Sequence, residues 1–222
     1  MNKTTIDWPG LTHTWNPVTG CKNGCAYCYA ARIAKRFNKS FEPQFHPNRL
    51  TDPEKEKEPC SIFVGSMTDL FGDFIPLDWT RKVLSACHKT PRHTFWFLTK
   101  NPENYFKFIA HFACIPNLKL GATITGSPDV RGREEQRIHA MEELGSRFSG
   151  INGTEIFLSA EPLLGAIPKL HTDGIKLIIA GPMTGAGAIP CKPEWMAFAR
   201  DAAVEYGATF YKKKTFQTGG AA

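Results

Sequence analysis

The sequence predicts an α/β protein built on a mostly parallel sheet, and three observations support this fold class. Short β-branched or aromatic runs alternate with segments that begin like helices, which is the order expected of successive βαβ units. Most of these runs, such as SIFVGS, TFWFLT and IKLIIA, are almost continuously apolar, as strands covered on both faces are. A chain of 222 residues with 42% hydrophobic side chains can also bury one large core, so we expect a single domain over residues 1–222.

The expected strands succeed one another along the whole chain. They are residues 11–17, 61–66, 94–99, 118–125, 155–160, 175–180 and 208–212. A parallel array of this kind forms either an open doubly wound sheet or a full or partial barrel. In both architectures ligands bind at the carboxyl ends of the strands, so functional residues are expected there.

Helices fit between these strands. They are expected over residues 29–37, from Asp78, from Asn101 with Pro102, over residues 131–144, and from Pro193 to the residue before Gly207. Asp78 is the type of residue that caps a helix, and proline suits the first helical turn. Residues 38–60 are polar, contain several prolines and exceed a usual connection in length, so we expect a loop, a flap or a partly ordered insertion there.

Composition narrows the class of protein. Lys and Arg outnumber Asp and Glu by 27 to 21, and this net charge of +6 favours anionic partners only weakly. The first residues, MNKTTIDWPGLTHTW, contain no apolar signal region, and no run approaches the roughly eighteen apolar residues of a membrane span. We therefore expect a soluble cytoplasmic protein that binds no membrane.

Three of the seven cysteines fall within eight residues, as Cys21, Cys25 and Cys28 in the pattern CxxxCxxC. This crowding indicates a metal site in a reducing compartment rather than a disulfide framework. Thiolates hold iron-sulfur clusters, and a four-iron cluster with three protein ligands leaves one iron open for another molecule. Zinc is the alternative, with His13 as a fourth ligand, although no second cysteine pair follows. An inert group of buried cysteines is a further alternative.

The motif follows the first expected strand and has Tyr27 immediately before its third cysteine, and in this it resembles the radical S-adenosyl-L-methionine (SAM) superfamily. The pieces WNPVTGC, SMTDLFGD, FLTKNP, LSAEPLLG and FYKK are similar, in order and approximate spacing, to a phage-associated subfamily of radical-SAM-like proteins. The resemblance implies a partial (β/α)6-type TIM-like barrel of mostly parallel strands. It also implies a 4Fe-4S cluster on the three cysteines, with SAM on the open iron.

The activity implied by the resemblance is reductive cleavage of SAM. An external donor supplies one electron through the cluster, and the resulting 5′-deoxyadenosyl radical abstracts a hydrogen atom from the substrate. We expect a nucleotide or nucleic-acid substrate. This expectation rests only on the modest basic charge and on the phage association of the subfamily. Two other functions remain open, namely a zinc-stabilised nucleic-acid-binding module and a non-catalytic iron-sulfur redox sensor.

Several cofactor-binding residues are implied by the same resemblance. Thr68 and Asp69, after the second strand, would face the amino group of SAM, or else cap the turn that follows. Thr125 and Arg137 would bind the ribose and carboxylate of SAM, although a surface arginine is the alternative. Tyr27 would cover the cluster or the adenine, unless it is an ordinary core ring.

The fifth strand ends in Ser159-Ala-Glu161, and we expect both polar residues at the cofactor. A carboxylate at an apolar strand end is costly to bury unless it is bonded, so Glu161 is expected to be catalytic or to bind cofactor, with a structural salt bridge as the alternative. Gly181 begins a glycine-rich loop that could approach adenine, although the subfamily has a Gly-Gly-Glu-like element there. Cys191, in a loop at the expected active face, is a candidate hydrogen-atom donor.

Lysines also stand near the expected strand ends. Lys100 follows the third strand, where a cation can meet a carboxylate or a phosphate, or simply lie in solvent. Near the end of the chain, Lys212 is expected to point into the pocket mouth, whereas Lys213 and Lys214 are expected to be solvated.

Overall fold

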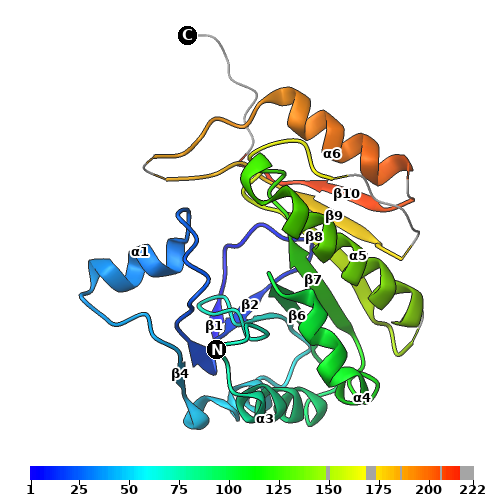
Figure 1. The fold of residues 1–222 in the computed structure, drawn as a ribbon. Coiled ribbons are helices and arrows are strands. Elements are labelled where there is room, and N and C mark those ends of the chain that lie inside the picture. Colours follow the sequence, from blue (N-terminus) through cyan, green and yellow to red (C-terminus); the bar gives the residue numbers. More distant parts are fainter. Residues whose placement is uncertain (149–150, 169–173, 186, 206, 216–222) are drawn as a thin grey trace.

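The computed structural model describes residues 1–148, 151–168, 174–185, 187–205 and 207–215. A single eight-stranded sheet runs across the molecule in the order β1-β2-β5-β6-β7-β8-β9-β10 (Figure 1). Its strands are β1 Asn2–Lys3, β2 His13–Trp15, β5 Ser61–Val64, β6 Thr94–Thr99, β7 Leu118–Thr123, β8 Glu155–Ala160, β9 Leu177–Ala180 and β10 Thr209–Lys212. Every neighbouring pair from β2 to β10 is parallel, whereas β1 runs antiparallel to β2. The α/β class with a mostly parallel sheet is confirmed.

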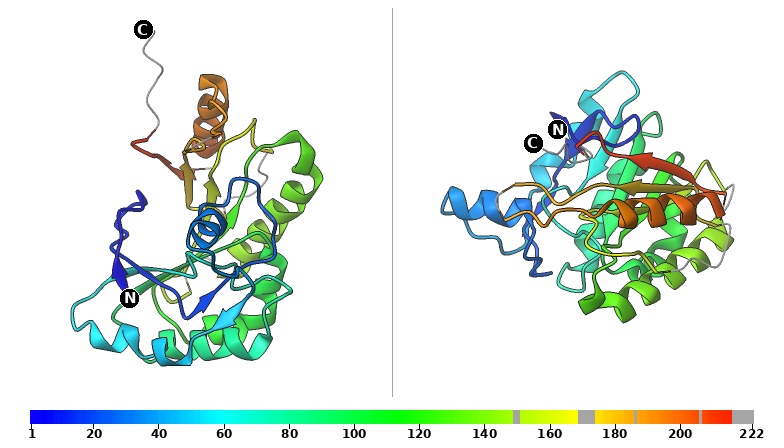
Figure 2. Two further views of the ribbon diagram at one scale, coloured as in Figure 1. Left: turned by 90° about the vertical axis from the view of Figure 1, so that its left-hand side faces the viewer. Right: turned by 90° about the horizontal axis from the view of Figure 1, so that it is seen from above.

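Helices follow most of the strands. They are α1 Tyr29–Arg36, α2 Asp52–Lys55, α3 Leu77–His88, α4 Ile109–Phe112, α5 Arg131–Phe148 and α6 Pro193–Glu205, with 3-10 helices at Pro47–Arg49, Pro102–Phe108 and Pro128–Val130. Helices α3 to α6 lie along one side of the sheet, whereas α1 stands apart from this layer and projects from the molecule (Figure 2). None of the helices described is long and apolar enough to cross a membrane.

The beginning of α3 differs from the prediction. The helix starts at Leu77 after Pro76, and no side chain caps it. Asp78 therefore lies inside the first turn, and its carboxylate pairs with Lys82 at 2.6 Å, one turn further along. The prediction that Asp78 caps this helix is wrong, because the helix already begins at Leu77, with Pro76 at the cap position.

The helix expected from Asn101 and Pro102 begins as a 3-10 helix over Pro102–Phe108 and continues as α4. Pro102, Tyr105 and Phe108 are all buried. A 3-10 helix has three residues per turn, so it places side chains three positions apart on one face. The tighter helix thus directs all three side chains into the core.

Residues 38–60 form a long connection that contains short regular elements. Its strand β4 Gln44–Phe45 pairs antiparallel with β3 Val18–Thr19, just before the cysteine motif. Helix α2 follows, and its Asp52 accepts from the N-terminal ammonium group at 2.9 Å. The insertion is therefore attached to the beginning of the chain at two points.

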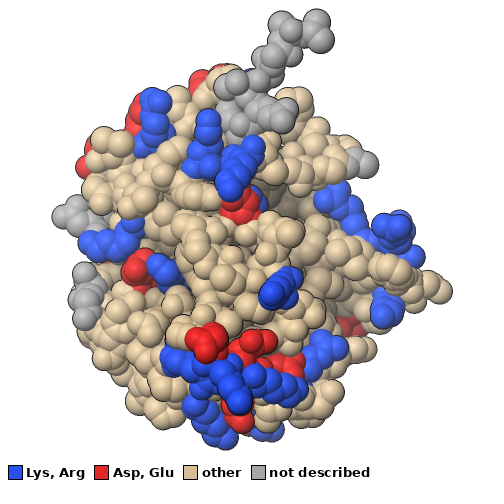
Figure 3. Space-filling view, turned by 180° about the vertical axis from the view of Figure 1, so that it is seen from behind, with Lys and Arg blue, Asp and Glu red and all other residues tan. Residues whose placement is uncertain are grey.

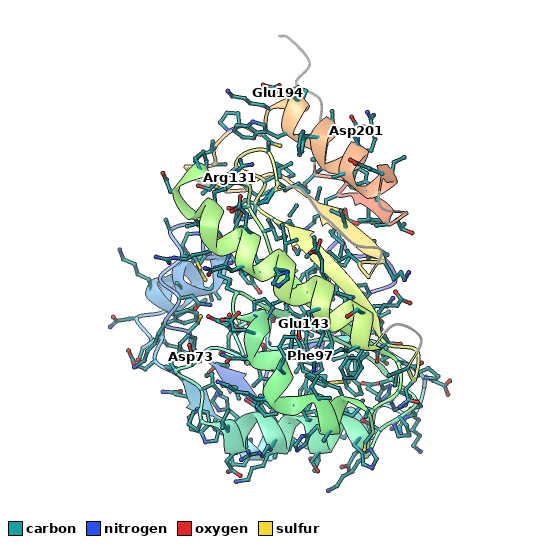
Figure 4. The ribbon with its side chains drawn as sticks, turned by 45° about the vertical axis from the view of Figure 1, so that its right-hand side comes forward. Asp73, Phe97, Arg131, Glu143, Glu194 and Asp201 are labelled. Carbon is teal, nitrogen blue, oxygen red and sulfur yellow. The ribbon has the colours of Figure 1, made fainter. Side chains whose placement is uncertain are left out.

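Alternate residues of the strands pack into two separate cores. On β6, Phe97 (labelled in Figure 4) belongs to the core between the sheet and the helices. Its neighbour Trp96 points to the opposite face and packs in a smaller inner core. There the ring of Trp8 lies 4.7 Å from that of Phe63 and 5.5 Å from those of Trp96 and Phe157, measured between centroids. Trp8, from the segment before β2, thus fills the inner face of the sheet.

Gly121 of β7 provides the space that this inner core needs. A Cβ atom at position 121 would lie 2.2 Å from the ring of Phe157 on the neighbouring strand. No side chain larger than hydrogen fits at that distance. The absence of a side chain on β7 thus admits a full phenyl ring from β8 into the inner core.

Hydrogen bonds also connect the beginning of the chain with the last strand of the sheet. The carboxylate of Asp7 accepts from the Tyr211 hydroxyl at 2.6 Å and from the Lys214 backbone N–H at 2.6 Å. The hydrogen bond from Tyr211 lowers the pKa of Asp7 more than any other lowering contribution. The segment between β1 and β2, at one edge of the sheet, is therefore joined to β10, at the other edge.

Candidate active site

A cavity of about 420 Å³ opens at the carboxyl ends of the strands. The residues predicted for the site that line it are Cys21, Cys25, Tyr27, Cys28, Thr68, Asp69, Ser159 and Glu161. Four other predicted residues, Thr125, Arg137, Gly181 and Cys191, are not among those that line it. The fold thus brings the cysteine motif together with the ends of β5, β6 and β8, where a parallel β/α array binds ligands.

The cysteine trio, Cys21, Cys25 and Cys28, lies on the loop between β3 and α1. Cys28 is the residue before α1, and its Sγ accepts from the backbone N–H of Ala31 at 3.4 Å. The Sγ of Cys21 accepts from the Asn23 N–H at 3.5 Å. Donors of this kind support sulfur ligands in iron-sulfur proteins. Burial raises the pKa of the Cys21 thiol to about 11, and the charges of Asp69 and Cys25 act in the same direction, whereas the backbone N–H groups of Asn23 and Asp69 oppose the rise. A metal bound there therefore displaces a proton.

The spacing of the three sulfur atoms distinguishes between metal centres. They do not all lie within 4.8 Å of one another. Two ligands of one zinc ion, each bonded at about 2.3 Å, are at most about 4.6 Å apart. The loop is therefore too open for a single ion and suits a larger cluster. His13, the fourth ligand of the zinc alternative, is grouped with Glu56 and Cys60 instead.

The turn after β5 holds the cysteine loop in place. The Gly20 N–H donates to the Met67 carbonyl at 2.9 Å, and the Thr68 hydroxyl donates to the Gly20 carbonyl at 2.6 Å. Gly20 has a φ of +88°, and a Cβ there would lie 2.1 Å from the Glu42 carbonyl oxygen. Glycine is thus required where three segments meet. The side chain of Thr68 lines the cavity but is committed to this contact.

Asp69 connects the cysteine loop with two strand ends. Its buried carboxylate accepts from Asn23 Nδ2 at 2.8 Å, the Thr99 hydroxyl at 2.6 Å and the Lys100 N–H at 2.9 Å. It also accepts from the Phe71 N–H and from Asn101 Nδ2. A carboxylate has about four lone-pair positions, so both oxygens are saturated by protein donors. Asp69 therefore positions the loop, and its predicted contact with SAM stays a prediction.

Glu161 forms a bonded pair in the wall of the cavity. Its Oε2 accepts from Trp8 Nε1 at 3.0 Å, and its Oε1 lies 2.5 Å from Lys213 Nζ. Buried Gly181 lies beside this pair, since a Cβ there would be 2.8 Å from Lys213 Cδ and 3.2 Å from Glu161 Cγ. The observed role of Gly181 is thus to leave room for the ion pair, and its predicted approach to adenine stays a prediction.

Of the lysines near the end of the chain, Lys213 lines the cavity and Lys212 does not, so the expectations for Lys212 in the pocket and for Lys213 in solvent are both wrong. The pairing of β10 with β9 continues beyond the strand, because the Lys213 N–H donates to the Ala180 carbonyl at 2.9 Å. Side chains alternate along an extended strand, so Lys213 shares the inner face with Tyr211. Because Lys212 is the neighbouring residue along the strand, its side chain points to the opposite face.

Ser159, near the end of β8, contributes an unpaired polar atom. Its hydroxyl is buried beside the cavity and has no hydrogen-bond partner in the described structure. Leaving a buried hydroxyl unsatisfied costs about 1–3 kcal/mol. A bound molecule with a donor or an acceptor at this point would remove that cost, so Ser159 marks a position where the cavity fits a polar ligand.

Thr125 and Arg137 support the wall from outside the lining. The N–H and hydroxyl of Thr125 donate to the buried carboxylate of Glu134 at 2.6 and 2.7 Å. The guanidinium of Arg137 donates to the carbonyls of Lys100 at 2.7 Å and Thr123 at 3.3 Å. Both residues therefore fix the ends of β6 and β7, and their predicted contacts with SAM stay predictions.

Glu134 is a site residue that sequence reasoning missed. A signal was available, because the buried positions of α5 include Ile138, Met141 and Phe148, and this stripe continues back by four residues to Glu134. A carboxylate on the apolar stripe of a helix must be satisfied inside the protein.

Tyr27 and Lys100 meet on another side of the cavity. The Lys100 ammonium lies 5.2 Å from the centre of the Tyr27 ring, within the range of a cation–π contact. Burial raises the pKa of Tyr27, while the Lys100 charge acts against this rise. The ring and the cation together give the cavity a flat face with a positive charge beside it.

Cys191 lies away from these groups. It packs at the margin of the core between sheet and helices, and its Sγ lies 3.7 Å from the Lys192 carbonyl oxygen. Burial raises the pKa of its thiol, with Glu194 contributing in the same direction. The structure does not bring this thiol into the lining of the cavity, so its predicted hydrogen-atom transfer stays a prediction.

Fold and site together define the class: an α/β partial-barrel protein with a three-cysteine loop at the carboxyl ends of its strands. The family model described as a protein of unknown function, DUF5131, matches residues 3–220, and the chain belongs to this family. No curated protein matches the chain.

Solved structures of spore photoproduct lyase share the fold. For one cysteine-to-alanine mutant the TM-score is 0.61 at 11% identity, covering 95% of this chain and 78% of that chain. For a cysteine-to-serine mutant it is 0.54 at 12% identity, covering 96% and 78%. For the lyase complexed with dinucleoside spore photoproduct it is 0.51 at 11% identity, covering 95% and 78%. The sheet thus resembles the partial TIM barrel of that lyase.

Proposed function

We propose that this protein is a radical SAM enzyme whose Cys21, Cys25 and Cys28 hold a 4Fe-4S cluster. The observation that carries the proposal is that these thiols line one cavity at the strand ends, yet are spread too widely for a single ion. Three thiolates on a four-iron cluster leave one iron for SAM. The sequence resemblance to radical SAM proteins and the partial-barrel fold support the same conclusion.

The residues around the cavity fit such a cofactor. The volume of about 420 Å³ lies within the range of about 300–1,000 Å³ that is usual for ligand sites. The unpaired Ser159 hydroxyl offers a polar contact, and the rings of Tyr27 and Tyr29 offer flat surfaces for adenine. When bound, the cluster and SAM would supply a one-electron cleavage that starts radical chemistry.

The chain's own residues would position and shield these groups. Asp69 and Thr68 hold the cysteine loop against the ends of β5 and β6. Trp8 closes the floor of the cavity and orients Glu161, which Lys213 fixes from the other side. These contacts keep the wall rigid and reduce the entry of water to the reacting groups.

We further propose an anionic substrate of the nucleotide or nucleic-acid class. Arg32, Lys100 and Lys213 line the cavity, and α1 beside it carries further basic residues with no Asp or Glu between residues 22 and 41. Tyr29, Ile33 and Phe37 form an exposed apolar stripe along α1 at four-residue spacing. Basic residues interleaved with exposed rings are typical of surfaces that bind single-stranded nucleic acid.

Two comparisons support this substrate class. In Figure 3, which shows the molecule from behind, basic and acidic side chains are intermixed near the lower edge, so attraction for a polyanion is partly cancelled there. Helix α1 itself contains Arg32, Lys35 and Arg36 and no acidic residue. Spore photoproduct lyase, whose fold is similar, has been solved with a dinucleoside spore photoproduct.

The test is anaerobic reconstitution of the full chain with iron and sulfide, followed by incubation with SAM and a strong reductant. We expect about four irons per chain and release of methionine and 5′-deoxyadenosine. The Cys25→Ser variant should release neither product, and the Cys114→Ser variant, which alters an exposed thiol outside the cavity, should behave like the wild type.

Three results would contradict the proposal. Zinc bound at the cysteine trio in place of iron would favour the nucleic-acid-binding module. A cluster that forms but does not bind SAM would favour the redox sensor. A cluster that binds SAM and releases no 5′-deoxyadenosine would remove the enzyme claim.

A further inference from the structure

A second group of possible metal ligands lies at the amino-terminal ends of the strands, on the side of the sheet opposite the cavity. His13 begins β2, Cys60 precedes β5, and Glu56 follows α2. One donor atom from each of these residues lies within 4.8 Å of the other two. Because β2 and β5 are parallel, the beginnings of these strands are at the opposite edge from the cavity. We call His13, Glu56 and Cys60 the mixed trio.

The three side chains of the mixed trio are a set that binds zinc. Imidazole nitrogen, carboxylate oxygen and thiolate sulfur are all zinc ligands, with bonds of about 2.0–2.3 Å. Two such ligands are at most about 4.6 Å apart, and the donor atoms of the three residues all lie within 4.8 Å of one another. All three residues are half-buried. His13 is remote in sequence from Glu56 and Cys60, which belong to one short segment, so the fold brings this segment to β2.

The hydrogen bonds of Thr12 determine which nitrogen of His13 is available. The single hydroxyl proton of Thr12 is donated to the Ser61 carbonyl at 3.0 Å. Its oxygen must therefore accept at its other contacts, from the Ser61 N–H at 3.1 Å and from His13 Nδ1 at 2.9 Å. Nδ1 of His13 then carries the ring proton, and Nε2 retains a lone pair. Metal-binding histidines have this arrangement, with the second nitrogen donating to a fixed acceptor.

The backbone beside the other two ligands is also held in place. The Cys60 N–H donates to His93 Nδ1 at 3.1 Å, so His93 carries its proton on Nε2 and donates it to the Pro53 carbonyl at 2.9 Å. Arg92 donates through Nε to the Glu56 carbonyl at 2.9 Å. Neither side chain is a member of the trio, and His93 is fully buried. The trio is thus supported by surrounding groups, as metal sites usually are.

We propose that His13, Glu56 and Cys60 bind one zinc ion, with water in the fourth position. The deprotonated carboxylate and thiolate balance the two charges of the ion, and the neutral imidazole completes three protein ligands. This ion would join the insertion at residues 38–60 to β2 at the end of the barrel remote from the cavity. The proposal is independent of the proposed function, because it shares no ligand with the cysteine trio.

The experiment measures zinc bound to the full chain after its cluster has been loaded anaerobically. Zinc is added, the protein is desalted, and zinc and iron are determined on the same sample. We expect about one zinc per chain in the wild type and in Cys114→Ser. The Cys60→Ser and His13→Gln variants should lose at least nine-tenths of this zinc and keep their iron.

Two further measurements separate loss of a ligand from unfolding and from zinc bound at the cysteine trio. Glu56→Gln retains the size of the side chain, so a loss of zinc in this variant with unchanged circular dichroism identifies ligand loss rather than unfolding. In the variant with all three cysteines of the loop changed to serine, the zinc should remain, whether or not a cluster forms in the wild type. The proposal is overturned if the wild type binds no zinc, or if the variants of the mixed trio bind as much as the wild type.

Discussion

The two ends of the same sheet carry two cysteine-containing trios that differ in spacing. At the cavity, three thiols of one short loop are spread beyond the span of a single ion. At the opposite end, an imidazole from β2 and a carboxylate and a thiol from residues 56–60 lie nearly within that span. The comparison teaches that ligands close in sequence need not be close in space, and that the separation set by the fold decides how many metal atoms fit.

The two trios also share a feature. In both, residues that are not ligands fix the backbone, with Asp69 and Thr68 at the cavity and Thr12 and His93 at the other end. The positions of the proposed ligands are therefore built into the fold, and the comparison can be tested by changing these ligands and their supports separately.

The largest expected effect is loss of one metal without loss of the other. Cys25→Ser should abolish iron binding and 5′-deoxyadenosine release completely, because two thiolates remain for a cluster that needs three. Zinc at the mixed trio should be unchanged, as elemental analysis of the same sample will show. Equal loss of iron and zinc would mean that metal binding at one trio depends on the other trio.

The next effect concerns the support of the cysteine loop. Asp69→Ala removes the acceptor of five hydrogen bonds and leaves buried donors unpaired, so we expect a loss of about 3 kcal/mol or more in the free energy of unfolding. Asp201→Ala alters an exposed residue of α6 (Figure 4) and should change it by less than about 0.5 kcal/mol. Denaturant unfolding of both variants checks this, and equal values would remove the positioning role of Asp69.

A smaller effect is expected at the support of the mixed trio. Thr12→Val removes the acceptor for His13 Nδ1, so zinc affinity should fall by about ten- to a hundredfold while iron content is unchanged. Thr14→Val, in β2 and two residues further along the chain, is the matched control. Competition with a zinc chelator measures both affinities, and an unchanged value in Thr12→Val would argue against the tautomer that we assign.

The smallest effect belongs to neither trio. The Tyr211 hydroxyl holds the pKa of Asp7 below its ordinary value. A depressed carboxylate pKa stabilises the fold above the unfolded-state value of about 3.9, and this contribution is lost as the pH falls through the folded-state pKa. Asp7→Asn should therefore be slightly less stable than the wild type near neutral pH and equally stable in acid. If the difference in stability persists in acid, the pKa of Asp7 is not its cause. The binding of both proposed metals should be unaffected by this substitution.

The strands could be predicted from the sequence because their apolar runs are long and bounded. Strands β6 and β8 match the expected residues 94–99 and 155–160 at both ends. Strand β2 is shorter than the expected 11–17, as its regular pairing with β5 covers only His13, Thr14 and Trp15. The cysteine trio could be recognised in the sequence because its residues form one continuous motif, and its role in binding a cluster stays a prediction.

The supporting residues were harder to predict because their partners are remote in sequence. Trp8 and Glu161 are separated by 153 positions, and Asp69 meets donors from three segments. Such contacts follow from the register of the strands, which composition does not reveal. The cavity is lined by Lys213 where Lys212 was expected, which shows that an error of one residue in register assigns the wrong side chain to the site.

The saturation of Asp69 bears on the order in which the protein is assembled. Small zinc domains remain unfolded until their metal arrives, because nothing else holds their ligands. Here the carboxylate of Asp69 ties the loop to two neighbouring strand ends through side chains and amides alone. If the cysteine trio holds the proposed cluster, the chain can therefore fold before iron arrives, and cells can time iron delivery as a later maturation step.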